Sequence, residues 1–117
     1  DLPAVTAQIA QWISQPENQA IDGIHVSDDH LLPGVVAGLT QAGRSIGKDI
    51  AVISNSNRNL KLNWPEGSWS VLEFDPALLG KSAVELLLEC LTGHATELPS
   101  LAINPRWKQG TSHLLEQ

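Results

Sequence analysis

The feature that most constrains the fold of this chain is an alternation of short strand-like segments with longer segments of helical periodicity. Residues 21–26 and 50–53 have the composition of short buried strands, and residues 32–42 repeat apolar side chains at helical spacing. Strands that alternate with helices along a chain favour a parallel sheet flanked by helices. The sequence therefore predicts an α/β fold built on a partial doubly wound parallel sheet.

Helix start signals divide the rest of the chain. A proline stands in the first turn of each predicted helix, where its missing N–H does no harm, and Asp75 is placed to cap the last one. Gly34 and Gly38 have a helix-packing spacing, which we expect to let that helix approach the sheet closely. Cys90 lies on an apolar stripe and is predicted to be a small core residue. The predicted elements are helices over 3–14, 32–42 and 75–93, strands over 21–26, 50–53, 69–74 and 101–103, and a loop over 54–68.

Charge and composition exclude several functions for this segment. Its 117 residues carry a formal net charge of -6, and a surface of that sign repels nucleic acid phosphates, so we expect no DNA binding by the segment itself. Neither a signal-peptide pattern nor an apolar run long enough to span a membrane is visible. One cysteine allows no internal disulfide, which is compatible with the cytosol. Because the chain begins at Asp1 rather than Met, we expect residues 1–117 to be a single-domain fragment of a longer protein.

Polar residues follow each of the three predicted parallel strands, at 27–29, 54–58 and 73–75. Ligands gather at the carboxyl ends of parallel strands, because loops and helix N-termini meet there. The side chains offer acceptors, amides and one aromatic face, which suits a small polyhydroxylated or amide-bearing molecule. The alternative for Asp28, as for Asp75, is a structural role as a helix N-cap.

Signals for catalysis are weak. The sequence has no nucleophile elbow, no phosphate-binding loop and no cysteine pair for a metal. His25 and His30 are separated by a strand-to-helix junction, so their side chains need not converge, and His94 and His113 are expected to be solvated. We therefore predict that the chain is not an enzyme and has no catalytic residue, no cofactor and no metal site.

Four motifs occur in a fixed order over residues 21–112. They are a strand ending in two aspartates (22–29), a glycine-bounded helix leading to Ile-Gly-Lys-Asp-Ile-Ala-Val-Ile (34–53), the strand Ser-Val-Leu-Glu-Phe with its Leu-Gly helix (70–93), and the close Leu-Ala-Ile-Asn-Pro-Arg with Gly-Thr-Ser (101–112). In this order they resemble the C-terminal part of the effector-binding core of LacI-family transcriptional regulators. The resemblance implies a periplasmic-binding-protein-like fold and a domain that dimerises and senses a small molecule between two lobes.

The resemblance also implies roles for individual residues. Family members have Gly-aromatic-Asp-Asp after the second strand, whereas this chain has Ser54-Asn55-Ser56-Asn57, so both expected carboxylates are missing. Carboxylates are strong acceptors for sugar hydroxyls, and their loss, together with an aromatic Phe74, favours a less polar effector than a plain sugar or the loss of ligand binding. By position, the predicted effector contacts are Asp28, Ser56, Asn57 and Phe74, and the predicted subunit contacts are Pro33 and Trp64.

What surrounds this segment follows from the same resemblance. A DNA-binding helix-turn-helix and a first lobe are expected upstream, and the helix at 75–93 is expected to pack on that other lobe. Alone, this helix would expose an apolar stripe, so we predict self-association, as a dimer or by helix exchange. The expected location is the cytoplasm, without membrane contact. The alternative function is a periplasmic solute-binding protein of a transporter, although Arg106 and the Gly-Thr-Ser at 110–112 favour the regulator.

Overall fold

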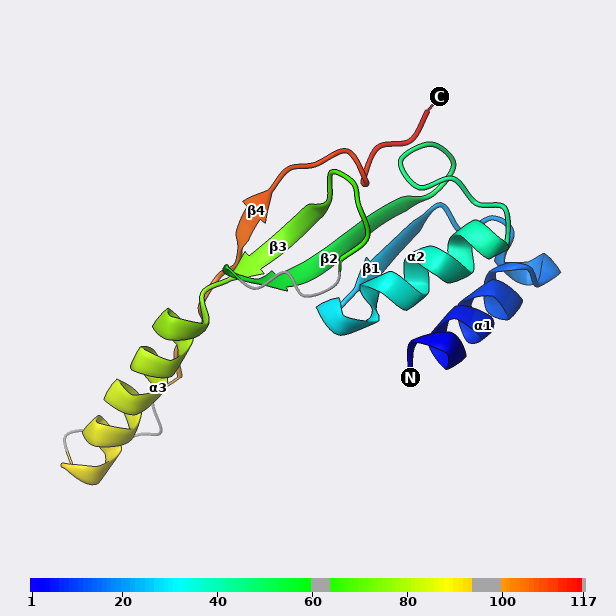
Figure 1. Cartoon of the computed structure of the whole chain (residues 1–117). Coiled ribbons are helices and arrows are strands. Elements are labelled where there is room, and N and C mark those ends of the chain that lie inside the picture. The colour runs from blue at the N-terminus through cyan, green and yellow to red at the C-terminus, as the bar shows by residue number, and fades with distance from the viewer. Residues whose placement is uncertain (60–63, 94–99, 117) are drawn as a thin grey trace.

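A four-stranded, mostly parallel sheet organises the molecule, as Figure 1 shows for the computed structural model, which describes residues 1–59, 64–93 and 100–116. Its strands are β1 (Gly23–Val26), β2 (Ala51–Asn57), β3 (Ser70–Phe74) and β4 (Arg106–Lys108), in the order β1-β2-β3-β4. The first three are parallel, while β4 pairs antiparallel with β3. The predicted α/β class with a partial parallel sheet is confirmed.

Three α-helices accompany the sheet: α1 (Leu2–Ile13), α2 (Leu32–Gln41) and α3 (Pro76–Leu91). Two short 3-10 helices, η1 (Pro16–Asn18) and η2 (Asp29–Leu31), precede β1 and α2. Gly43 follows α2 with a φ of 76°, a left-handed conformation that ends helices and that side chains disfavour.

The core lies between α2 and one face of the sheet. Leu32 and Leu39 of α2 and Val52 of β2 are fully buried, and α1 packs beside α2 and adds Ile13 to the core. A Cβ atom on Gly38 would lie 2.7 Å from the Ile9 Cβ of α1, so only glycine allows the two helices to come this close. The small residues Gly34 and Gly38 therefore face α1, and the prediction that they face the sheet was wrong.

Two predicted elements differ from the structure. β2 runs to Asn57, whereas a loop was predicted from residue 54, because β3 supplies ladder partners for these polar residues as far as the pair Asn57 and Phe74. Residues 101–103 form no strand; the last strand is β4, because residues 106–108 are the ones that reach the free edge of β3. An apolar run alone does not make a strand without a neighbouring edge.

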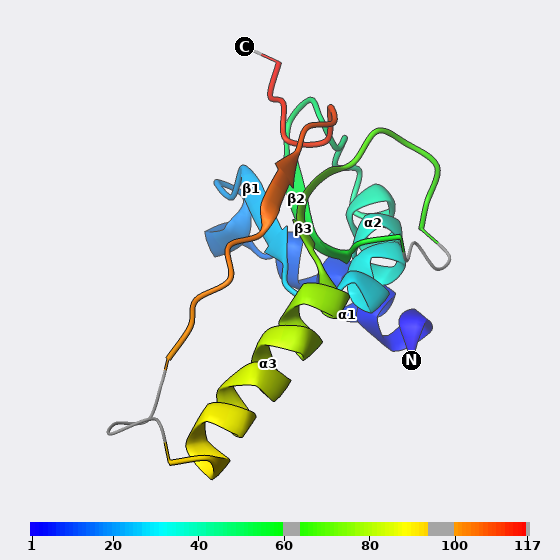
Figure 2. The same cartoon turned by 90° about the vertical axis from the view of Figure 1, so that its left-hand side faces the viewer.

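α3 projects away from the sheet and from the other two helices (Figures 1 and 2), and the molecule measures 57 × 26 × 25 Å. Its apolar side chains are largely uncovered: Leu87 is 57% and Leu91 73% exposed. Cys90 is exposed as well, so the prediction of a core cysteine was wrong because this helix has no core to join. In the part of the chain that the structure describes, no helix has the length and apolarity needed to cross a membrane.

Candidate functional site

A cavity of about 380 Å³ opens at the carboxyl edge of the parallel strands. The register places Asn57 opposite Phe74 at the ends of β2 and β3, while the turn after β1 closes the third side. All four residues predicted to contact an effector line this cavity, which we call the carboxyl-edge cavity. Its lining consists of Ser27, Asp28, Asp29, His30, Asn55, Ser56, Asn57 and Phe74.

The turn after β1 is held by Asp28. Its Oδ1 atom accepts a hydrogen bond of 3.0 Å from the His30 backbone N–H and so caps η2, which matches the alternative, structural reading of this aspartate. The same oxygen is 3.2 Å from His30 Nδ1, and Asp29 Oδ1 is also 3.2 Å from that nitrogen. The Asp28 side chain nevertheless remains 59% exposed, so capping leaves most of the carboxylate free to meet a ligand.

Asn55 fixes this turn to the sheet. Its Nδ2 donates a 2.8 Å hydrogen bond to the Ser27 carbonyl, and its Oδ1 lies 3.0 Å from His25 Nε2. Both ends of the amide are therefore engaged within the protein, which makes Asn55 a positioning residue. His25 and His30 have different partners, as their spacing suggested.

Two side chains that line the carboxyl-edge cavity, those of Asn57 and Phe74, remain available for contact with a ligand. Across residues 1–59, 64–93 and 100–116, the Asn57 amide has no hydrogen-bond partner, and the half-buried ring of Phe74 lies beside it in the ladder. Ser56 differs: it is 2% exposed and donates only a long 3.4 Å hydrogen bond to the Asn57 carbonyl. Together with the Asp28 carboxylate, the Asn57 amide and the Phe74 ring are therefore the groups available to a ligand. Ser56 forms the floor of the cavity.

An ion pair joins the residues that directly follow Asn57 and Phe74 in the sequence. Arg58 Nη1 lies 2.9 Å from Asp75 Oδ2, and Asp75 also caps α3 by accepting hydrogen bonds from the Ala77 and Leu78 N–H groups, as predicted. The hydrogen bond from Leu78, followed by the one from Arg58, holds the pKa of Asp75 below its ordinary value of 3.8. Arg58 is therefore directed toward the start of α3.

Three side chains of this cavity are also of a type that ligates metals. One oxygen each from Asp28 and Asp29 and one nitrogen of His30 lie within 4.8 Å of one another. Their mutual contacts at 3.2 Å already account for this arrangement as an Asp–His–Asp cluster. No metal was predicted here, and the sequence signal that could have indicated the cluster is the consecutive Asp-Asp-His at 28–30.

The residues predicted at a subunit interface lie in different settings. Pro33 is half-buried in a shallow groove between α1 and α2, next to Leu2 and Ala37. Trp64 is half-buried and packs against the hydrophobic core.

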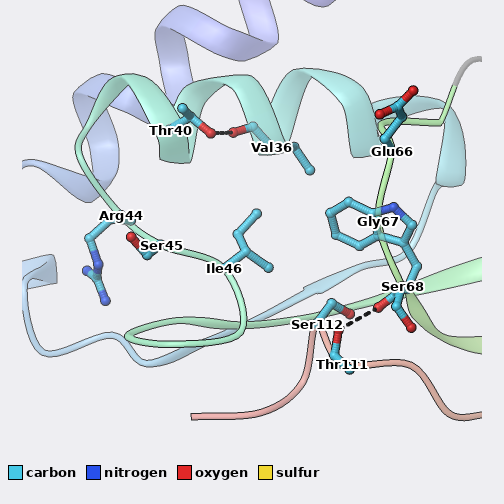
Figure 3. A pocket seen from close by; sticks show the side chains of 11 residues that line it. Val36, Thr40, Arg44, Ser45, Ile46, Glu66, Gly67, Ser68, Thr111 and Ser112 are labelled. Atoms are coloured by element: carbon cyan, nitrogen blue, oxygen red, sulfur yellow. Dashed lines mark hydrogen bonds between the residues drawn. The ribbon is translucent and has the colours of Figure 1, made fainter. Parts of the chain in front are cut away.

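A second cavity, also of about 380 Å³, lies at the opposite, amino-terminal edge of the sheet (Figure 3). Val36 of α2 and Ile46 of the following loop project into it, while Arg44 lies at its side. Arg44 donates to the Ile21 and Asp49 carbonyls, so its guanidinium is engaged in holding the loop. We call this the amino-edge cavity; it was not predicted from the sequence.

A Ser–His pair follows two lining residues of the amino-edge cavity in the sequence, Trp69 and Ser112. Ser70 Oγ lies 2.6 Å from His113 Nδ1 and accepts a hydrogen bond from the Gly110 N–H. His113 is half-buried and its ring meets Trp107 edge-on, so the prediction of a solvated His113 was wrong. Ser70 is 0% exposed, which keeps substrates away from its hydroxyl and makes the pair structural. His94 lies outside the described residues.

Comparison with known proteins identifies the family to which this fold belongs. Residues 1–113 match the model of the periplasmic binding protein-like domain, and the chain belongs to that family. No curated protein matches it.

Superposition on solved structures describes the fold more specifically. A LacI family transcriptional regulator from Arthrobacter sp. FB24 in complex with lactose superposes with a TM-score of 0.66 at 26% identity, covering 96% of this chain and 41% of that one. A second structure of that regulator gives a TM-score of 0.70 at 26% identity over 96% and 42% of the two chains. A regulator from Enterococcus faecium with bound ribose gives 0.67 at 22% identity over 93% and 39%, a likeness of fold alone. The chain thus has the fold of a LacI-family effector-binding domain and spans about two fifths of these proteins.

Proposed function

We propose that this chain is the C-terminal part of the effector-binding and dimerising core of a LacI-type transcriptional regulator, acting in the cytoplasm and without catalysis. The observation that carries the proposal is the convergence of Asp28, Asn57 and Phe74 around one cavity at the carboxyl edge of a parallel sheet. Support comes from the Arthrobacter regulator of the same fold, whose structure is a complex with lactose.

In this function the carboxyl-edge cavity is one wall of a cleft between two lobes. A small molecule that binds the closed arrangement better than the open one shifts the equilibrium toward closure. The shift alters the spacing of the upstream helix-turn-helix domains that bind DNA. Effector binding and DNA binding are thereby coupled, although the two sites are distant from each other. Binding and reorientation suffice, and no bond of the effector needs to be made or broken.

A thermal-shift screen of sugars, nucleosides and amino acids against the full-length protein tests the proposal. A molecule that binds only the folded protein raises its Tm, by an amount that grows with concentration. We expect Asp28→Ala and Asn57→Ala to abolish the rise caused by the best compound. Asp22→Ala, an exposed aspartate before β1 and thus at the opposite end of that strand, is the matched control and should keep the rise. An unchanged rise in both cavity variants would refute the site.

The proposal also gives α3 a partner. In the full-length protein this helix packs on the other lobe; in the 117-residue chain a second copy covers it, as a dimer or by helix exchange. The support is its exposed stripe, since Leu79 and Leu87 are each 57% exposed. Sedimentation velocity of the 117-residue chain should give a species larger than a monomer, and Leu87→Glu should shift it toward monomer. A clean monomer at all working concentrations would contradict self-association.

Subunit contact through Pro33 and Trp64 is a separate part of the proposal. Pro33 lies on the groove between α1 and α2, where a large charged side chain would obstruct a partner surface. We expect Pro33→Arg to raise the dimer dissociation constant of the full-length protein, while Thr40→Arg, exposed on the same helix, serves as the control. Equal dissociation constants for the wild type and the Pro33 variant would remove this contact from the interface.

A further inference from the structure

We propose that the effector presents a positively charged group, an ammonium or a guanidinium, to the wall formed by Asp28, Asn57 and Phe74. This inference rests on the proposed function, because it names the class of ligand that the same cavity takes. It goes beyond that function because effector binding alone leaves the ligand's charge open.

The first argument is the charge of the lining. Among the residues that the structure describes around the carboxyl-edge cavity, two are carboxylates, Asp28 and Asp29, and none is Lys or Arg. His30 is the one lining side chain that can become cationic, and it lies against both carboxylates at 3.2 Å. The nearest arginine, Arg58, is paired at 2.9 Å with Asp75 and does not line the cavity. Among the described residues that line the cavity, an anionic ligand group would therefore meet carboxylates without a free Lys or Arg side chain to balance its charge.

The second argument is the match of donors and acceptors. An ammonium group donates three hydrogen bonds and accepts none. Asp28 offers a carboxylate oxygen that is not used in capping, since its contacts with His30 all involve Oδ1, and its side chain is 59% exposed. The free Asn57 amide contributes a carbonyl oxygen. Phe74 contributes an aromatic ring, and the face of such a ring attracts cations through its quadrupole. All three groups of the wall thus favour a cation: two accept its hydrogen bonds, and the third attracts its charge.

The carboxylates alone would not specify a ligand, since Asp28 and Asp29 also serve the turn. What adds specificity is that the aromatic ring and the uncommitted amide come from two other strands and border the same space. Arg58 also has a separate partner, so it does not compensate the carboxylates from the side. Together these features define a cation-selective surface.

The experiment compares ligands that share one scaffold and differ in one charged group. Galactosamine, galactose and galacturonate form one triple; cyclohexylmethylamine, cyclohexanemethanol and cyclohexanecarboxylate form a second that is not a sugar. Dissociation constants are measured by isothermal titration calorimetry on the full-length protein at low and high NaCl. On the scaffold that binds best, we expect the amine to bind at least about tenfold more tightly than the neutral member, and this advantage to shrink in high salt.

Two variants separate this inference from the proposed function. Asp28→Asn keeps the shape and the capping oxygen but removes the charge, and it should abolish most of the advantage of the amine. Asp22→Asn removes the same charge at the opposite end of β1 and should leave the advantage intact. A neutral or acidic member that binds as tightly as the amine overturns the charge preference while leaving the proposed function standing. Absence of binding by both triples overturns the charge preference, whereas the proposed function falls only if the wider thermal-shift screen also finds no compound.

Discussion

Two cavities of the same volume lie at opposite edges of one sheet, and they differ in the side chains that converge on them. In the amino-edge cavity, the Thr40 hydroxyl bonds the Val36 carbonyl 2.9 Å away, and Ser112 Oγ bonds the Val52 carbonyl at 2.6 Å. In the carboxyl-edge cavity, the Asn57 amide and much of the Asp28 carboxylate stay available. The comparison teaches that volume alone does not identify a binding site; the carboxyl-edge cavity stands out because an available carboxylate, an amide and an aromatic ring converge on it from the ends of three strands.

The difference follows from what each edge must do for folding. The amino edge joins the last segment of the chain to the starts of β2 and β3, so its side chains hold backbone groups that would otherwise be buried without a partner. At the carboxyl edge, folding uses the caps supplied by Asp28 and Asp75 and the hydrogen bond from Asn55 to the Ser27 carbonyl. Side chains that are not needed for folding there can serve a ligand.

The largest expected effect is on stability, from Ser112→Ala at the amino edge. Ser112 Oγ accepts from the buried Ser70 N–H at 3.0 Å and donates to the Val52 carbonyl, and both partners would lose a hydrogen bond. We expect a loss of about 2 kcal/mol in the free energy of unfolding, measured by urea denaturation. Thr111→Ala is the control, because its 3.5 Å bond to the Ser68 carbonyl is long and exposed. Equal losses in the two variants would show that the edge is not held by these buried bonds.

A smaller effect concerns pH at the carboxyl edge. The pKa of Asp75 is lowered in the folded protein, so its ionised form stabilises the fold above the ordinary value of 3.8, and this contribution disappears as pH falls through the lower, folded pKa. Asp75→Asn should therefore reduce the free energy of unfolding at pH 6 and flatten its decline below about pH 4. Parallel pH profiles for the wild type and the variant would contradict the role of the ion pair with Arg58.

The smallest expected effect is from Thr40→Val in the amino-edge cavity. The Thr40 hydroxyl is exposed and bonds its own helix, so its replacement by a methyl group should change the free energy of unfolding by less than about 0.5 kcal/mol. The Tm rise caused by the best effector should stay the same. A lost Tm rise in this variant would reverse the assignment of the two cavities.

Much of the carboxyl-edge cavity could be predicted because topology alone gathers the ends of parallel strands. Topology predicted the segments 27–29, 54–58 and 73–75, and the resemblance to LacI-family regulators singled out Asp28, Asn57 and Phe74 within them; all three residues line one cavity. The Asp75 cap was predicted from a local signal, Asp followed by Pro, that needs no tertiary information.

The remainder depends on contacts between distant segments. The strand character of residues 54–57 comes from pairing with β3, and the Ser70–His113 contact joins residues 43 apart in the sequence. The exposure of Cys90 has the same origin, because periodicity indicates an apolar stripe but not whether anything covers it. The amino-edge cavity was missed because its lining comes from separate segments, and the Gly-Thr-Ser motif at 110–112, which supplies two of its residues, indicated only the family resemblance.

The most direct test of the two-cavity comparison is a nuclear magnetic resonance titration of the full-length protein with the compound that raises its Tm most. Each cavity has its own reporter: the Asn57 side-chain amide at the carboxyl edge, and at the amino edge the Trp69 indole N–H, which donates to the Pro65 carbonyl at 2.8 Å. We predict that the Asn57 resonances shift with saturating ligand while the Trp69 resonance stays in place. A shift of Trp69 with Asn57 unchanged would contradict the placement of the effector site at the carboxyl edge.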